Sequence, residues 1–486
     1  MSSLCDTEPS ESRSGAPRRE LTVYDSTCII VGIIVGAGIY RISPEVAAKS
    51  PGVAALTALW LLGGAFALLG SLCYAELATA YPKEGGDYVY LTRALGRPVG
   101  FLFAWCQLWI VRPGSIGVMA YAFAEFANRI WPQATGAAGV RVTVAYAAGA
   151  VVALTAINLL GVREGKWTQN VLTTVKALGL VAVVVVGFLF TSSHAIALQP
   201  LQHGGSALPA QAAAASQRLD WWNSLGSLGT AMVLVLFTYG GWNEMAYVAA
   251  EVRGSRRNIL HALLIGTLAV TAAYILINLA FVHALGFVGV GQTKAPAADV
   301  LELAIGPWAS VCISLLICIS ALSAVNGQIF TGSRIYYAMG TEHRFYAWLG
   351  RWNARRGTPD ASLLIQGAIT LALVVWFGLG QNGFEQMVIF TTPCFWFFLA
   401  LVGVSLIVLR VREPDVERPY RVPGYPMTPI LLSLGSVCLV YSGLLYAIRN
   451  RTPEALWSTL AVLATGVLVV LAGAATDCRR RRARRS

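Results

Sequence analysis

Two stretches of the chain place glycines inside otherwise apolar segments. The first runs from Val31 to Tyr40 and reads VGIIVGAGIY, and the second runs from Phe237 to Asn243 and reads FTYGGWN. Glycine lets helices approach closely, so such stretches are typical of helix-packing motifs. They are equally typical of helices that unwind in mid-membrane, where free N–H and C=O groups suit a carboxylate and an ammonium. The spacing alone leaves both interpretations open.

Three ionisable side chains lie in or beside these apolar segments. Lys176 falls in the middle of segment 168–191, where a lysine costs about 2.5 kcal/mol or more without partners, so we expect it to face the protein interior. Arg112 precedes Pro113 and is expected chiefly to stabilise a kink. Glu244 follows the second glycine stretch. We expect it in the outer half of its span, either pairing a cationic substrate or facing a vestibule or a neighbouring helix.

The segments that position these residues have the composition of membrane spans. Of 486 residues, 56% are apolar and only 12% are charged, against about 25% in soluble domains. Apolar runs of about 20 residues recur along almost the whole chain. We predict an all-α polytopic membrane protein with twelve spans, at about 25–48, 52–80, 98–127, 140–160, 168–191, 222–251, 258–286, 306–337, 361–379, 385–410, 428–448 and 454–475.

The distribution of Lys and Arg predicts the orientation of these spans. An even number of spans puts both termini on one side, and that side holds 26 of the 36 Lys and Arg residues, against eight on the other. Both termini are therefore predicted to be cytoplasmic, in the plasma (inner) membrane. The same distribution explains the net charge of +12 without nucleic acid, for which no binding motif is present.

The sequence shows no motif for metal, disulfide or enzyme chemistry. The nine cysteines lie mostly in apolar runs without CxxC spacing, the five histidines are scattered, and there is no HExxH or GxSxG. We expect no cofactor, no metal and no enzymatic activity.

The glycine stretches, together with further motifs along the chain, resemble the amino acid–polyamine–organocation (APC) superfamily, and within it the L-type amino acid transporter branch. That branch carries G-[SA]-G-I-[FY] in its first span and F-x-Y-G-G-W-N in its sixth. Further matches, in order, are Tyr74-Ala75-Glu76-Leu77 with Gly85-Gly86-Asp87-Tyr88, Arg112-Pro113, Val325-Asn326-Gly327 and Glu417-Arg418-Pro419. The resemblance covers nearly all of residues 22–445.

The resemblance implies a LeuT-type fold, which is a five-plus-five inverted repeat with two extra C-terminal helices and alternating access around a central amino acid. The expected parts are a cytoplasmic tail (1–20), a transport core (21–410), helices eleven and twelve (411–476) and an Arg-rich cytoplasmic tail (477–486). The two repeats of the core are expected at about 21–191 and 222–410.

The resemblance also implies the residues that bind the substrate. Backbone N–H groups of Gly36, Ala37 and Gly38 would hold its carboxylate, and the carbonyls of Ile33, Ile34 and Phe237 its amino group. Phe237 would also close over it as a gate. The side-chain pocket would be shaped by Tyr239, Gly240, Trp242 and Asn243, for whose aromatic members ordinary packing is the alternative. Ala37 stands where the family often has serine, so a hydroxyl contact is missing there.

Lys176 takes, by the same resemblance, the place of a sodium ion in sodium-coupled relatives. Its ammonium would bond the carbonyl end of the first unwound stretch and the hydroxyls of Ser320 and Ser323, which lie three residues apart on one helical face. This arrangement predicts sodium-independent transport and leaves proton release by Lys176 open. Phe281 stands where the family often has a tyrosine, so a polar contact from that span is in doubt.

Together these features predict a sodium-independent transporter of neutral L-amino acids that acts as an exchanger. A proton-coupled importer or a cationic amino acid/polyamine antiporter stays open because of Glu244 and Lys176, and a non-transporting sensor is less favoured because the tails are short. Animal members of the branch bind a glycoprotein through a cysteine between spans three and four. Loop 128–140 has no cysteine, so we expect no disulfide-linked heavy chain and a prokaryote-like, stand-alone protein, with amino acid and lipid as partners.

Overall fold

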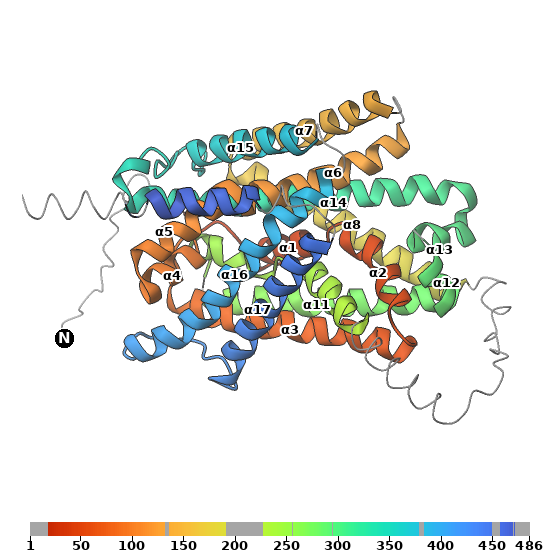
Figure 1. Ribbon diagram of the computed structural model, residues 1–486, viewed down its shortest axis with the longest axis horizontal. Helices are drawn as coiled ribbons and strands as arrows, with labels where there is room; N and C mark the ends of the chain where they lie inside the picture. The colour runs from red at the N-terminus through yellow and green to blue at the C-terminus, as the bar shows by residue number, and fades with distance from the viewer. Residues whose placement is uncertain are drawn as a thin grey trace, which may run out of the picture.

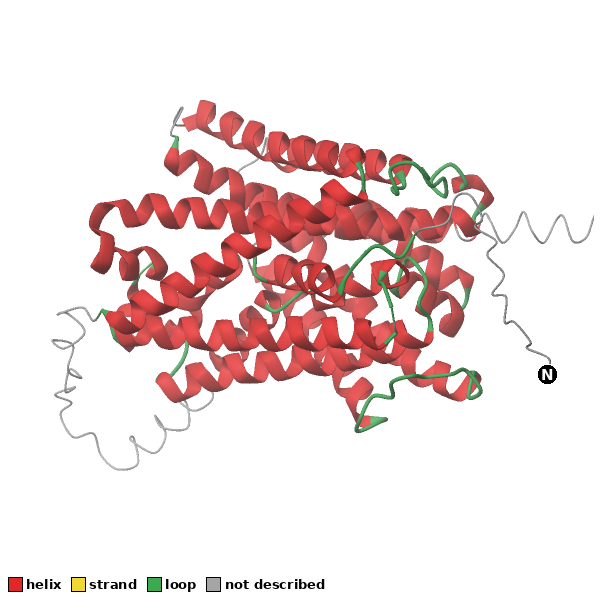
Figure 2. Cartoon of the chain, turned by 180° about the vertical axis from the view of Figure 1, so that it is seen from behind, coloured by secondary structure: helices red, strands yellow, loops and turns green. Residues whose placement is uncertain are grey.

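The computed structural model describes residues 18–131, 136–190, 227–254, 256–293, 295–378, 383–449, 457–469 and 471. Throughout these residues the fold is helical, and extended pairing is limited to the isolated bridges Leu21–Val252 and Asn353–Thr358. Figure 2 shows helices joined by short loops. The predicted all-α class is confirmed.

The helices follow one another with few long connections. The first half contains α1 (Val23–Ile34), α2 (Gly38–Ala48), α3 (Val53–Ala80), α4 (Asp87–Leu95), α5 (Arg97–Cys106), η1 (Gln107–Val111), α6 (Arg112–Ile130), α7 (Gly136–Leu160) and α8 (Val162–Leu189). The second half contains a helical segment at 227–238, η2 (Trp242–Glu251), α11 (Arg257–Leu285), α12 (Phe287–Gln292), α13 (Pro296–Ile305), η3 (Gly306–Trp308), α14 (Ala309–Glu342), η4 (Arg344–Tyr346), α15 (Asp360–Gly378), α16 (Gly383–Arg412), α17 (Met427–Arg449) and the apolar helix Trp457–Val469.

Ten predicted spans coincide with apolar helical elements of membrane-crossing length. Nine single helices in the described ranges are long and apolar enough to cross a membrane, and α1 with α2 forms a tenth span, bent by 49°. The two remaining predicted spans, 222–251 and 454–475, lie partly outside the described residues. The structure therefore confirms a polytopic membrane protein.

The packing of the helices follows the inverted repeat. The second spans of the two expected repeats are α3 and α11, and these two helices pack against each other. The third spans, α6 and α14, likewise pack against each other. α1 lies at the centre, in contact with α8, α11, α14 and η2 (Figure 1). This is the arrangement expected for a LeuT-type transporter core.

Three short helices in the loops were not predicted. α4 packs against α5 and α16 at one end of the bundle, while α12 and α13 lie at the opposite end near α2 (Figure 1). They have six to ten residues, too few for an apolar run of spanning length. α4 begins after Gly85 and Gly86, whose φ angles of 92° and 44° lie in the left-handed region that favours glycine.

The start of α1 and the end of η2 are held together. Leu21 bridges Val252, and its N–H donates to the Glu251 carbonyl at 2.8 Å. The Glu251 carboxylate accepts a 2.7 Å bond from Arg334 of α14 in a pair whose side chains are 0% and 1% exposed. Hence η2, which follows the turn at residues 239–241, lies at the same end of the bundle as the start of α1. Glu244 is therefore in the half of its span on the side of the N-terminus, so the expected outer-half position and the expected cytoplasmic N-terminus do not agree with each other.

We predict that Gly70→Val destabilises the bundle. A Cβ at Gly70 in α3 would lie 2.1 Å from the indole of Trp242 in η2, and such overpacking costs about 1–3 kcal/mol. The unfolding midpoint of the purified protein in detergent should fall. The matched change Gly149→Val in α7, where no heavy atom of the described residues lies within 4 Å of the added Cβ, should leave the midpoint nearly unchanged. Equal midpoints for the two variants would contradict this packing.

Candidate substrate-binding site

The first glycine stretch is a break in a membrane helix. α1 ends at Ile34, residues 35–37 are not helical, and α2 begins at Gly38. Helix ends leave backbone groups without intrahelical partners. The amide of Ala37 and the carbonyl of Ile33 have no hydrogen-bond partner within the described residues, and the first turn of α2 presents further N–H groups. The unwound interpretation is confirmed for this stretch.

Two of the expected substrate contacts are already used inside the break. The N–H of Gly36 donates to the carbonyl of Ile34 at 2.8 Å, and the hydroxyl of Tyr274 donates to the same oxygen at 2.9 Å. In this conformation the Gly36 amide is not free, and the Ile34 carbonyl already accepts twice. Ala37, Gly38 and Ile33 keep their roles as predictions.

The second glycine stretch is also a break. The helical segment 227–238 ends in a turn at 239–241, after which η2 begins. Gly241 has a φ of 112°, and a Cβ there would lie 2.8 Å from the side chain of Ile33. Glycine is thus required both by the backbone angle and by the close approach of the first break. The Phe237 carbonyl accepts from the Gly240 N–H at 3.2 Å and keeps its second lone pair.

A tyrosine that links the two breaks was missed by the sequence reasoning. The Tyr274 hydroxyl in α11 lies 2.9 Å from the carbonyl of Ile34 and 3.4 Å from that of Thr238. Tyr274 is seven residues before Phe281, two helical turns away on the same face. A polar contact from this span to both breaks therefore exists, although it comes from Tyr274 and not from position 281.

Lys176 binds the carbonyl end of α1. Its side chain is 0% exposed, and Nζ donates to the carbonyls of Gly32 at 2.6 Å and Val35 at 2.8 Å. Ser320 Oγ donates to the same Val35 carbonyl at 3.2 Å. Charge-assisted bonds contribute about 1.5–3 kcal/mol each, which offsets the cost of burying the ammonium. The lysine therefore faces the interior rather than the membrane surface.

Ser323 does not make the expected bond to Lys176. Its hydroxyl lies 3.1 Å from Thr173 Oγ1 and accepts from Gln169 Nε2 at 3.3 Å, both on α8. Thr173 in turn donates to the Cys28 carbonyl at 3.0 Å. Because Ser323 is one turn further along α14 than Ser320, it lies beside the body of α1 and not beside its broken end.

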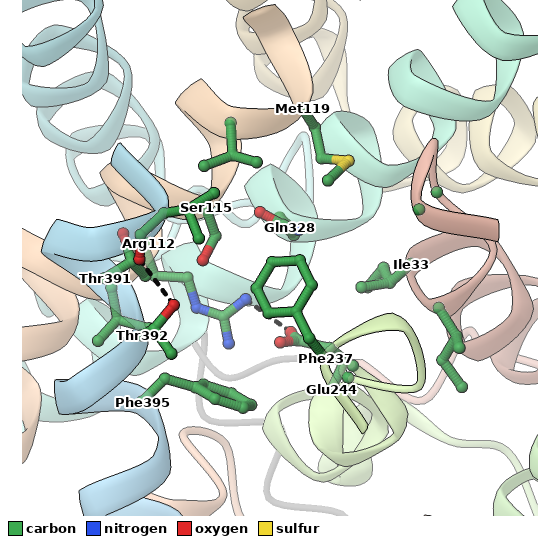
Figure 3. A pocket seen from close by; sticks show the side chains of 18 of the residues that line it. Ile33, Arg112, Ser115, Met119, Phe237, Glu244, Gln328, Thr391, Thr392 and Phe395 are labelled. Atoms are coloured by element: carbon green, nitrogen blue, oxygen red, sulfur yellow. Dashed lines mark hydrogen bonds and ion pairs between the residues drawn. The ribbon is translucent and has the colours of Figure 1, made fainter. Parts of the chain in front are cut away.

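One cavity is lined by both breaks together with α6, α14 and α16, and it has an empty volume of about 930 Å³, part of which is open to solvent (Figure 3). Its wall includes six of the predicted binding residues, namely Ile33, Ile34, Gly36, Gly38, Phe237 and Gly240. From α16 come Thr391, Thr392 and Phe395, which the sequence reasoning did not name. The cavity is large enough to contain an amino acid.

Three predicted pocket residues do not line this cavity, and two of them pack against α3. The Tyr239 hydroxyl donates to the Trp60 carbonyl at 3.0 Å, and the ring of Trp242 packs edge-on against Tyr74. Asn243 donates to the Tyr247 hydroxyl at 3.2 Å. Tyr239 and Trp242 therefore pack between helices, which was the alternative to a role in the pocket. Glycines of α3 leave the room into which their rings extend.

Arg112 follows a π-helical turn, η1, in which its N–H bonds the Gln107 carbonyl. Pro113, which has no N–H, comes directly afterwards, so the expected distortion lies here. The guanidinium points at the cavity and pairs with Glu244, with Nη1 at 2.6 Å from Oε2 (Figure 3). Thr331 donates to the same carboxylate oxygen at 2.6 Å. The partner of Glu244 is thus a residue of a neighbouring helix.

A second carboxylate lies behind this ion pair. The guanidinium of Arg112 stacks over the ring of Tyr247, whose hydroxyl donates to Asp87 at 2.6 Å. Asp87 begins α4, in the connection between two spans, and is 3% exposed. Burial raises the pKa of Asp87 to about 7, against the opposing effect of the hydrogen bond from Tyr247.

Comparison with known proteins agrees with this architecture. Residues 21–470 match the family model described as amino acid permease. The chain belongs to the amino acid permease family. It is 30% identical to the human b(0,+)-type amino acid transporter 1 over 454 residues, which is 93% of this chain and 88% of that protein. It is 29% identical to the mouse Asc-type amino acid transporter 1 (84% and 73% covered) and 28% identical to the mouse large neutral amino acids transporter small subunit 2 (96% and 83% covered).

For this permease we predict that Lys176→Met lowers amino acid uptake by proteoliposomes at least about tenfold, because buried carbonyls lose their donors. Uptake rates are to be compared at equal amounts of folded protein. The control is Lys83→Met, which removes an exposed lysine that donates no hydrogen bond to the break, and it should transport at the wild-type rate. Uptake at the wild-type rate in Lys176→Met would refute the role of the ammonium.

We also predict a pH-dependent effect of Asp87→Asn on the stability of the permease. The pKa of Asp87 is about 7 in the fold, above the reference value of 3.8, so the wild type loses stability as pH rises from about 4 to 7. Asparagine stays neutral and keeps an acceptor for Tyr247. The variant should unfold at a higher temperature than the wild type at pH 8, by a margin that shrinks toward pH 5. The control Asp415→Asn, at an exposed site, should not change the unfolding temperature at either pH. An equal unfolding temperature of Asp87→Asn and wild type at pH 8 would show that burial does not disfavour the Asp87 carboxylate.

Proposed function

We propose that this permease is a sodium-independent exchanger of neutral L-amino acids that works by alternating access. The observation that carries the proposal is the position of Lys176, whose ammonium binds the Gly32 and Val35 carbonyls beside a cavity that both helix breaks line. Free amides at the start of α2 suit the substrate carboxylate, and the Ile33 and Phe237 carbonyls suit its amino group.

The charges on the cavity wall favour a neutral substrate over a cationic one. Glu244 is paired with Arg112 at 2.6 Å, with side chains 6% and 3% exposed. A cationic substrate that took Glu244 would leave the guanidinium buried without its partner, at a cost of about 3–5 kcal/mol. Gly240, which also lines the cavity, has no side chain that could pair with a charged substrate. The relatives named above include an Asc-type and a large-neutral amino acid transporter.

Sodium independence and exchange follow from the same lysine. A sodium ion needs oxygen ligands, and Lys176 already uses the carbonyls at the broken end of α1. Without a driving ion, the gradient of a second amino acid becomes the available source of energy for uptake. Exchange is therefore the mode that the fixed ammonium favours.

The cellular setting is proposed from sequence features. The split of 26 to eight Lys and Arg residues favours cytoplasmic termini in the plasma (inner) membrane. The absence of cysteine from loop 128–140 favours a protein that works without a disulfide-linked heavy chain, although one relative is named a small subunit. Residues 132–135 of that loop and the two tails, 1–17 and 472–486, lie outside the described residues.

The proposal is tested by uptake into proteoliposomes. Labelled alanine, serine or leucine should enter several-fold faster when the lumen holds unlabelled amino acid. The rate should be the same in sodium chloride and in choline chloride, because Lys176 leaves no cation site to fill.

Other outcomes would contradict parts of the proposal. Absence of uptake for every amino acid would exclude transport and favour a sensor. Uptake driven by a pH gradient without stimulation by luminal amino acid would favour a proton-coupled importer. Equal exchange of lysine or arginine would show that the Arg112–Glu244 pair opens to cations.

A further inference from the structure

The ion pair on the cavity wall has hydrogen-bonding capacity left over. Arg112 donates through Nη1 to Glu244 and Thr331 and through Nε to Gln107, while Nη2 has no partner within the described residues. Glu244 accepts at Oε2 from Arg112 and Thr331, and Oε1 accepts no bond from any described residue. Both residues line the cavity. One charged donor and one charged acceptor therefore remain available to a ligand.

A third polar group on the same wall lacks a partner. Gln328 lies on α14 one turn before Thr331, lines the cavity and is only 9% exposed. Its Oε1 is buried and makes no hydrogen bond within the described structure. A buried oxygen without a donor costs roughly 1–3 kcal/mol. Because Gln328 lines the cavity, a turn of its side-chain amide would bring this oxygen to the cavity, where an N–H group of a bound ligand would remove that cost.

The charges select the chemistry of the ligand group. Because Arg112 and Glu244 cancel, a side chain with a net charge would meet a like charge as well as an opposite one. A purely apolar side chain would leave Nη2, Oε1 of Glu244 and Oε1 of Gln328 buried and unpaired, which a site built for hydrogen bonds rejects strongly. The group that matches all three atoms is neutral and has an acceptor and donors at one end.

We propose that Arg112, Glu244 and Gln328 form a side-chain subsite for carboxamide amino acids, glutamine and asparagine. This rests on the proposed function, since the ammonium and carboxylate of the substrate are held at the helix breaks. The amide oxygen accepts from Nη2 of Arg112, and the amide N–H groups donate to Glu244 and Gln328. Phe237 and Phe395, which line the same cavity, cover the aliphatic stem.

The first test is competition against labelled alanine in wild-type proteoliposomes. Asparagine and leucine have nearly the same shape, with an amide in place of two methyl groups, and aspartate adds a charge to that shape. Asparagine should inhibit at about tenfold lower concentration than leucine or aspartate, the factor expected for one or more buried hydrogen bonds. The same order should hold for glutamine against methionine and glutamate.

Substitutions of two glutamine residues of the protein, one at a time, test which residue causes the preference for asparagine over leucine. Gln328→Met keeps the length of the side chain and removes the unpartnered oxygen, so the asparagine-to-leucine preference should fall about tenfold. Gln366 of α15 is the matched control, because it is also buried with an unpartnered Oε1 but does not line the cavity. Gln366→Met should leave the preference at its wild-type value.

The ion pair is tested by replacing both partners at once. The double variant Arg112→Met, Glu244→Met leaves no unpaired buried charge, which protects folding, and it should prefer leucine over asparagine. If the double variant does not fold, the comparison of Gln328→Met with Gln366→Met decides. Exchange of alanine with equal inhibition by asparagine and leucine would overturn the subsite alone, whereas absence of any amino acid exchange would overturn the proposed function.

Discussion

The structure depends on how the backbone groups at the helix breaks find partners away from water. An unpaired carbonyl in the interior of a membrane protein costs several kcal/mol, so a span can unwind only where other groups supply hydrogen-bond donors. At the first break Lys176 and Ser320 both donate to Val35, and Gly36 and Tyr274 both donate to Ile34. Among the described residues the Ala37 amide and the Ile33 carbonyl stay unpaired, and these are the two groups of the break that we propose for the substrate.

Those donors tie the break to the rest of the bundle. Lys176 belongs to α8, Ser320 to α14 and Tyr274 to α11, so three helices share the task of stabilising one unwound turn. The second break is coupled to the first directly, because Gly241 has room only for a hydrogen against Ile33. A displacement of either half-helix must therefore break or shift bonds on several helices together. Alternating access needs this kind of coupling, in which a bound substrate biases two packed arrangements.

Elements with a strong, local signature were predictable from the sequence. Apolar runs located ten of the spans, and the stretches around Gly36 and Gly241 indicated helix breaks as one of two open interpretations. The inward orientation of Lys176 followed from the cost of burying its charge. The short helix α4, the hydroxyl of Tyr274 and the partner of Glu244 were not predictable, because each depends on which helices meet in space. Tyr239 and Trp242 were misplaced for the same reason, since the room for their rings comes from glycines on α3.

The balance of charge around the cavity explains why a neutral amino acid suits this site. Arg112 and Glu244 cancel one another across 2.6 Å, and Lys176 is stabilised by carbonyl dipoles without a carboxylate among its hydrogen-bond partners. A zwitterion brings an ammonium and a carboxylate to opposite backbone ends and changes none of these pairings. A substrate with net charge would have to open the ion pair or add charge near the buried ammonium. We therefore propose that the fixed charges disfavour charged substrates by electrostatics, while the shape of the cavity and its unpaired polar atoms select among neutral side chains.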